Sequence, residues 1–275
     1  MTLQSQGIPH VVQTSGAGAR ILVGAPDADR ARAELAEYGK ESEDWPPAPE
    51  PTPPRLTSGI PGAAVFAAVI VAIYPVGQRG AFGTDWWSRG RIDADAVMDG
   101  EWWRSITALT LHVDVQHLVS NLVFGVLFGV LSAQSLGTGV AWLGTVLAGV
   151  GGNLVECTLV DPSHRAVGAS TAIFGTLGLM VASEWARRGR MHVSWVRRAA
   201  PLFGGAVLFG WLGGGDDSGR VDVLAHAMGF LVGAVIGVAV GRWDLPSKLS
   251  PVSQKGLSIV ALAIIATGWA IALTR

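Results

Sequence analysis

The chain has 275 residues, of which 49% are hydrophobic and 15% charged, with 37 glycines and 11 tryptophans. This composition fits helices packed in lipid better than a soluble core. The net charge of −1 offers no basic field for nucleic acid, and a single cysteine, Cys157, excludes an internal disulfide framework and a cysteine-rich metal site.

The first 58 residues differ from the rest of the chain. Two strand-like runs, IPHVVQTS and ARILVGA, flank SGAG, and DADRARAELAEYGKE follows with helical spacing. We expect a small soluble α/β domain at residues 1–45, a β-hairpin plus a helix, on the cytoplasmic side. Because so few residues bury little core, a loosely ordered tail is the alternative. The segment WPPAPEPTPPR predicts an extended, Pro-rich linker over residues 46–58.

Seven apolar stretches follow, each close to the roughly 20 residues that a helix needs to cross a bilayer. The fifth is short and rich in glycine. The sequence therefore predicts an all-α polytopic membrane domain over residues 59–275, with spans at about 59–77, 113–133, 138–158, 168–186, 198–214, 222–241 and 255–273.

Basic residues predict the orientation of these spans. Five arginines, between residues 187 and 198, follow the fourth span, and Arg242, Lys248 and Lys255 follow the sixth. Loops rich in Lys and Arg stay in the cytoplasm, so we expect the N-terminus inside and the C-terminus outside. The first outer loop also carries four arginines, which weakens the bias. Its pairs Trp86-Trp87 and Trp102-Trp103 favour the headgroup boundary.

Three of the predicted spans carry polar residues near the outer face of the membrane. His117 and Asn121 lie one and two turns into the second span and share a helix face, Ser170 begins the fourth, and His226 lies one turn into the sixth. Ionisable groups in hydrocarbon are costly, by about 2.5–3.5 kcal/mol or more on insertion scales, and are functional candidates. Their similar depth predicts one shared site.

Ser170 and His226 have the chemistry of a nucleophile and its base. The start of a helix offers unpaired backbone N–H groups that favour developing negative charge near Ser170. Glycines at positions 229, 233 and 237 allow another helix to approach His226 closely, and Gly168, Gly175 and Gly178 of the fourth span offer a matching surface. Each residue alone has a structural alternative: a serine bonded to its own helix, or a His or Asn that joins two helices.

Three segments, HVDVQHLVSN, VGASTAIFGTLG and DVLAHAMGFLVGAVIG, resemble in this order the signatures of rhomboid intramembrane serine proteases, and EWWR at 101–104 resembles an outer-loop element of that family. The resemblance covers residues 59–273. It implies a six-helix core plus a C-terminal seventh helix, a Ser170–His226 dyad, and an oxyanion hole formed by His117, Asn121 and the Ser170 backbone N–H. The implied substrates are transmembrane proteins cut in or beside their membrane segments.

The chain departs from the family pattern at two places. Thr171 stands where glycine usually follows the serine, and is expected to narrow or slow the site; Ala133 and Gln134 stand where a Glu is usual. A non-catalytic rhomboid-like protein that binds transmembrane helices is the alternative function, and a transporter lined by the same polar residues is a second.

We expect no metal and no organic cofactor. Glu156, Asp161 and His164 gather near the outer end of the third span, where a wet loop accounts for them, and Asp222 is expected to be the N-terminal acid of the sixth span. We expect lipid and membrane-protein partners, no nucleic acid, and a location in the plasma or inner membrane with the site open to the outer face.

Overall fold

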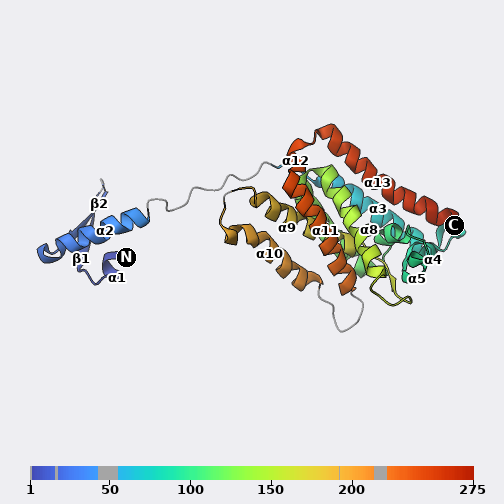
Figure 1. Ribbon diagram of the computed structural model, residues 1–275, viewed down its shortest axis with the longest axis horizontal. Coiled ribbons are helices and arrows are strands. Elements are labelled where there is room, and N and C mark those ends of the chain that lie inside the picture. Colours follow the sequence, from blue (N-terminus) through green and yellow to red (C-terminus); the bar gives the residue numbers. More distant parts are fainter. Residues whose placement is uncertain (1, 16–17, 43–54, 192, 214–221) are drawn as a thin grey trace. The chain divides into compact units, whose positions relative to one another are not determined.

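The computed structural model describes residues 2–15, 18–42, 55–191, 193–213 and 222–275. The chain divides into two compact units, Met1–Pro53 and Pro54–Arg275 (Figure 1). Most of the expected linker, residues 46–54, lies outside the described residues.

The first unit is a β-hairpin with a helix. Strands β1 (His10–Ser15) and β2 (Gly18–Val23) pair antiparallel, with His10 opposite Val23. Helix α1 (Thr2–Ser5), the 3₁₀ turn η1 (Ala25–Asp27) and helix α2 (Ala28–Glu41) complete it. Its small core is formed by Leu3, Ile8 and Ala31, with Val23 and Leu35 packed against them. The α/β segment expected from the sequence is therefore present.

The second unit is built almost entirely of helices, and the all-α class is confirmed. Its long helices in the described part of the chain are α3 (Ile60–Arg79), α7 (Val115–Leu136), α8 (Thr138–Cys157), α9 (Ser170–Arg188), α10 (Trp195–Gly213), α11 (Val223–Trp243) and α13 (Pro251–Thr274). Shorter elements are η2 (Ala81–Gly83), α4 (Trp86–Gly90), β3 (Ile92–Asp93), α5 (Ala94–Met98), α6 (Arg104–Thr107), η3 (Ala108–Thr110), β4 (Arg165–Ala166) and α12 (Leu245–Lys248).

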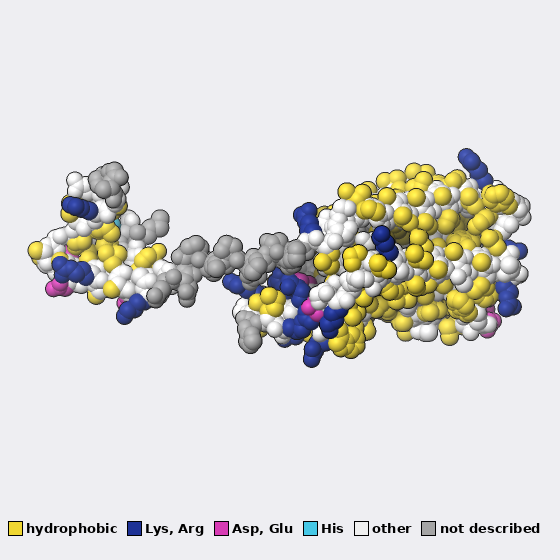
Figure 2. Space-filling view, turned by 90° about the horizontal axis from the view of Figure 1, so that it is seen from above, with side chains coloured by type: hydrophobic (Ala, Val, Ile, Leu, Met, Phe, Trp, Pro, Cys, Tyr) yellow, Lys and Arg dark blue, Asp and Glu magenta, His cyan; other side chains and the backbone are white. Residues whose placement is uncertain are grey.

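Five helices in the described part of the chain are long and apolar enough to cross a membrane: α3, α7, α8, α11 and α13. Helices α9 and α10, both expected as spans, are not among them. The last turns of α9 carry Glu184, Arg187 and Arg188, and the first turn of α10 carries Arg197 and Arg198. These charged residues lower the mean hydropathy of both helices. Figure 2 shows hydrophobic side chains over most of one face of this unit, with Lys and Arg mainly toward its ends.

Helix α9 lies against α11 along most of its length. A Cβ added at Gly229 would collide with the Thr171 carbonyl oxygen, and one added at Gly233 would collide with that of Gly175. Further along α11, a Cβ added at Gly237 would collide with the Leu179 carbonyl oxygen. The close helix approach predicted from these glycines is confirmed.

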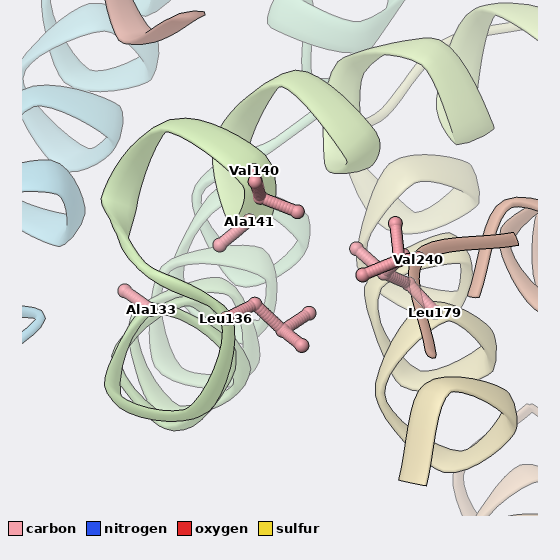
Figure 3. Close-up of a cluster of buried hydrophobic side chains, with 6 residues drawn as sticks. All are labelled: Ala133, Leu136, Val140, Ala141, Leu179 and Val240. Atoms are coloured by element: carbon pink, nitrogen blue, oxygen red, sulfur yellow. The ribbon is translucent and has the colours of Figure 1, made fainter. Parts of the chain in front are cut away.

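Buried apolar clusters hold the other helices around this pair. Figure 3 shows one of them, in which α7 and α8 meet α9 and α11 through Ala133, Leu136, Val140, Ala141, Leu179 and Val240. Ala133, where the family pattern has Glu, is fully buried there, and Gln134 donates from Nε2 to the Ser58 carbonyl oxygen at 3.2 Å.

The segment between α3 and α7 packs against the C-terminal helix. The rings of Trp86 and Trp269 lie 4.9 Å apart, and Trp269 Nε1 donates to Thr110 Oγ1 at 3.0 Å. Within the segment, Arg104 of the EWWR element donates to the carbonyl oxygens of Ser88 at 2.6 Å and Arg91 at 3.1 Å. These bonds tie the turns of the loop to one another.

Candidate functional site

One cavity brings together all four side chains singled out in the sequence. His117 and Asn121 reach it from α7, Ser170 from α9 and His226 from α11. The cavity measures about 200 Å³ and is lined by both polar and apolar side chains. Its remaining lining is Ser120, Phe124, Phe128, Val167, Ile173, Phe174, Leu212 and Asp222.

Ser170 is the first residue of α9, and it is partly exposed to the cavity. Gly168, two residues earlier, has a φ of +137°, a conformation that L side chains rarely adopt. Its N–H donates to the Ala108 carbonyl oxygen at 2.9 Å, which fixes the entry into the helix. The N–H groups of the first turn have no partner within the helix, so they are available to donate to a group bound at this helix end.

Gly168 also sets the distance between α9 and His117. A Cβ placed there would lie 2.7 Å from His117 Cε1 and 3.5 Å from Ser170 Oγ. The His117 imidazole and the Ser170 hydroxyl therefore both lie close to the Gly168 Cα. A side chain at position 168 would push the imidazole away from the serine.

His226 is 6% exposed and lies one turn into α11. Its ring stacks on Phe174, with centroids 4.3 Å apart. Since Phe174 lies one turn beyond Ser170 on α9, the stack fixes the imidazole beside the turn that carries the hydroxyl. Asp222 caps α11 by accepting from the Ala225 N–H at 3.0 Å, so its expected role as an N-terminal acid is confirmed.

Asn121 is 4% exposed, and its amide nitrogen donates to the His117 carbonyl oxygen at 2.8 Å. The amide carries two N–H groups, so one remains for another acceptor. Asp114 caps this helix by accepting from the His117 N–H at 2.7 Å. These bonds hold the first turns of α7 with His117 and Asn121 facing the cavity.

From its position five residues before His117, His112 is expected toward the surface, yet it is a buried neighbour of the site. It is 1% exposed, and its ring lies 5.2 Å from the His117 ring, centroid to centroid. Burial lowers the pKa of the His112 side chain to about 4, and His117 acts in the same direction. His112 is therefore a neutral, packed side chain behind His117 at physiological pH.

Thr171 faces away from the cavity. It is buried, and its γ-methyl group points at Gly152 of α8 and Gly229 of α11, both of which lack the Cβ that would collide with it. The expectation that Thr171 narrows the site is not met among the described residues, because the glycines of two neighbouring helices make room for its methyl group.

A family model, the rhomboid domain, matches residues 99–243. Among curated relatives, Rhomboid-like protein 11, chloroplastic, of Arabidopsis thaliana is 34% identical over 145 residues, 49% of this chain and 51% of the relative. Rhomboid protease GluP of Bacillus subtilis is 27% identical over 180 residues, 66% of this chain and 33% of the relative.

A third relative, putative rhomboid protease YdcA of the same bacterium, is 28% identical over 140 residues, 51% of this chain and 68% of the relative. The chain thus spans about half the length of Rhomboid-like protein 11 and a third of GluP. Because the family model covers more than half of the sequence and the helical fold agrees with it, this chain is a member of the rhomboid family, an integral membrane protein.

Proposed function

We propose that the protein is an intramembrane serine endopeptidase that hydrolyses peptide bonds in or beside the transmembrane segments of other membrane proteins. The observation that carries the proposal is the single cavity that Ser170, His226, His117 and Asn121 line together. Proteins of the same family include a rhomboid protease, GluP. A helix-binding protein without activity has no need for a serine and an imidazole in one pocket.

In the proposed reaction, the Ser170 hydroxyl attacks the substrate carbonyl carbon while His226 takes its proton. The carbonyl oxygen becomes an oxyanion, which the Ser170 backbone N–H, His117 and the free N–H of Asn121 stabilise by hydrogen bonding. His226 then protonates the leaving amine, and an acyl-enzyme remains on Ser170. Water, activated by the same imidazole, releases the acyl group and restores the serine.

The lining of the cavity supports a lateral route for the substrate. Phe124 and Phe128 on α7 and Leu212 on α10 are among its apolar lining residues, so the cavity lies between these two helices and offers apolar contacts to a segment from lipid. We propose that the substrate helix enters between α7 and α10 and unwinds there. The expected cap, residues 213–219, lies outside the described residues apart from Gly213.

The placement in the membrane is also a proposal. Arginines at the ends of α9 and the start of α10 support a cytoplasmic position for that loop, which places the N-terminal unit inside as well. The cavity then opens to the outer face of the plasma or inner membrane. We propose that the unit at residues 1–45 is a separate cytoplasmic domain.

A fluorophosphonate probe, which reacts with activated serines, tests this function directly. The purified full chain in detergent should be labelled, and labelling should be lost in both Ser170→Ala and His226→Ala. Ser88→Ala removes a serine from the outer loop and should label like the wild type. Absence of labelling in the wild type across several detergents, or labelling that survives Ser170→Ala, would refute the proposed dyad and favour a helix-binding protein.

A further inference from the structure

Glu156, in the last turn of α8, is a buried carboxylate without a hydrogen bond. Its exposed fraction is 0%, and neither of its side-chain oxygens has a hydrogen-bond partner among the described residues. The sequence places it in a wet loop, and that expectation is wrong. A buried carboxyl group without a hydrogen-bond partner costs free energy, so a ligand that binds its oxygens would stabilise this part of the fold.

Two other side chains converge on Glu156. His164, in the loop before α9, has its Nε2 3.4 Å from Glu156 Oε1 and 3.0 Å from Asp222 Oδ2. One possible ligand atom from each of the three residues lies within 4.8 Å of the others. His164 Nε2 nevertheless makes no hydrogen bond to a described residue. A distance of 3.0 Å without a hydrogen bond means that the nitrogen is not directed at the neighbouring oxygen.

We propose that Glu156, His164 and Asp222 form a binding site for a divalent metal ion of the zinc class. Zinc binds imidazole nitrogen and carboxylate oxygen at about 2.0–2.2 Å in a tetrahedron, whose ligand atoms are then about 3.4 Å apart. The 3.4 Å separation between His164 and Glu156 equals this value, and the 3.0 Å separation between His164 and Asp222 is somewhat shorter. The imidazole ligand disfavours Ca²⁺ and Mg²⁺, which take oxygen ligands.

The charges around the cluster support a cation. Two carboxyl groups face a single imidazole, and Arg165, which follows His164 in the chain, pairs instead with Asp93 at 2.9 Å. Asp222 can serve two partners at once, because its Oδ1 caps α11 while its Oδ2 faces His164. A divalent ion would balance both carboxylates without displacing the helix cap.

The site has an opening for the ion and for water. His164 and Asp222 have 25% and 26% of their side chains exposed, and both line an outer cavity of about 570 Å³. Three protein ligands with a fourth position left to water is a common arrangement of zinc. An ion here would join the end of α8, the loop that leads to Ser170 and the start of α11, which carries His226. The ion would thereby fix the helix ends that carry Ser170 and His226 relative to each other.

Zinc content of the purified protein tests the inference. The full chain, with any affinity tag removed, is stripped with a chelator, incubated with ZnCl₂, desalted and analysed by mass spectrometry for metal. We expect one zinc per wild-type chain. Glu156→Gln and His164→Ala should each lower zinc affinity at least about 10-fold, since even residues behind the ligands change it by 10–100-fold. Asp161→Asn, an exposed acid in the same loop, should bind like the wild type.

Two further measurements separate zinc binding from misfolding of the variants and from the proposed protease function. X-ray absorption of the zinc-loaded wild type should show nitrogen and oxygen neighbours, including an imidazole, at about 2.0–2.2 Å. Ser170→Ala should bind zinc like the wild type, because the site does not require an active serine. A wild-type chain that retains no zinc, or equal binding by Glu156→Gln and His164→Ala, would overturn the inference and indicate a carboxyl pair that shares a proton.

Discussion

Substituting Gly229 by alanine tests whether the contact between α9 and α11 sets the catalytic geometry. Gly229 lies three residues after His226, and its backbone meets the carbonyl oxygen of Thr171, the neighbour of Ser170. The added Cβ would stand closer to that oxygen than real Cβ atoms come to any other atom. Because the obstacle is backbone, it cannot move by changing a rotamer, so the two helices must separate.

The size of the effect follows from two opposing terms. Alanine is favoured over glycine in a helix by roughly 1 kcal/mol, while an extra group in a packed interior costs typically 1–3 kcal/mol. The unfolding free energy therefore falls by about 0–2 kcal/mol. The rate is more sensitive, since a misplacement of about 1 Å between reacting groups can cost on the order of 10²-fold. We expect Gly229→Ala to remain folded and to lose about 10²-fold in turnover.

The assay compares Gly229→Ala with a matched control in another helix. Gly256→Ala, in α13, adds the same methyl group where no atom lies within 4 Å, so it should keep the wild-type rate and gain slightly in thermal stability. Cleavage of a reporter transmembrane substrate and the rate of fluorophosphonate labelling are measured on the same samples. Wild-type labelling and cleavage in a folded Gly229→Ala protein would refute the claim that helix separation controls the dyad.

Two further predictions concern the residues around the cavity. Asn121→Ala should lower kcat by about 10²–10³-fold with little change in KM, because it removes a donor to the oxyanion. The control, Asn153→Ala, removes an equally buried amide that donates to the Ser105 carbonyl oxygen, and it should lower thermal stability more than kcat. Equal losses of kcat in the two variants would contradict the role of Asn121. For His112, the folded pKa of about 4 lies below the ordinary value of 6.5, so the unfolded chain binds the extra proton and the unfolding free energy falls by about 3 kcal/mol as the pH drops from 6.5 to 4. In detergent, the thermal unfolding temperature of His112→Leu should depend less on pH between 6.5 and 4 than that of the wild type. An unchanged dependence on pH would contradict the assigned protonation of His112.

The long helices were predictable because each requires only a local pattern. An apolar run of sufficient length determines that a helix forms and roughly where it ends, and the observed bounds differ from the expected ones by a few residues. The grouping of Ser170, His226, His117 and Asn121 in one cavity was also accessible, since all four lie near the same end of their helices. Depth along a helix can be read from residue number alone.

The rotation of each helix about its axis was harder to predict. The sequence suggested that Thr171 would crowd the site, yet its methyl group lies over Gly152 and Gly229, residues of two other helices. The exposure of Glu156 was misjudged for a related reason: its surroundings come from His164 and Asp222, which no local pattern connects to α8. Contacts among three separate segments depend on the packed arrangement and not on periodicity.

The composition of α9 follows from its position among the other helices. It lacks the apolar character of a lipid-exposed span, yet most of its first three turns is buried against α7, α8 and α11. A helix surrounded by protein needs no apolar exterior, because neighbouring helices rather than lipid meet its polar groups. Thr145 and Thr176 illustrate this, since their hydroxyls pair at 2.7 Å between α8 and α9. The proposed nucleophile Ser170 begins this protein-surrounded helix, so its hydroxyl faces protein side chains rather than lipid. The charged side chains that lower the hydropathy of α9 lie in its last turns, at the opposite end from Ser170.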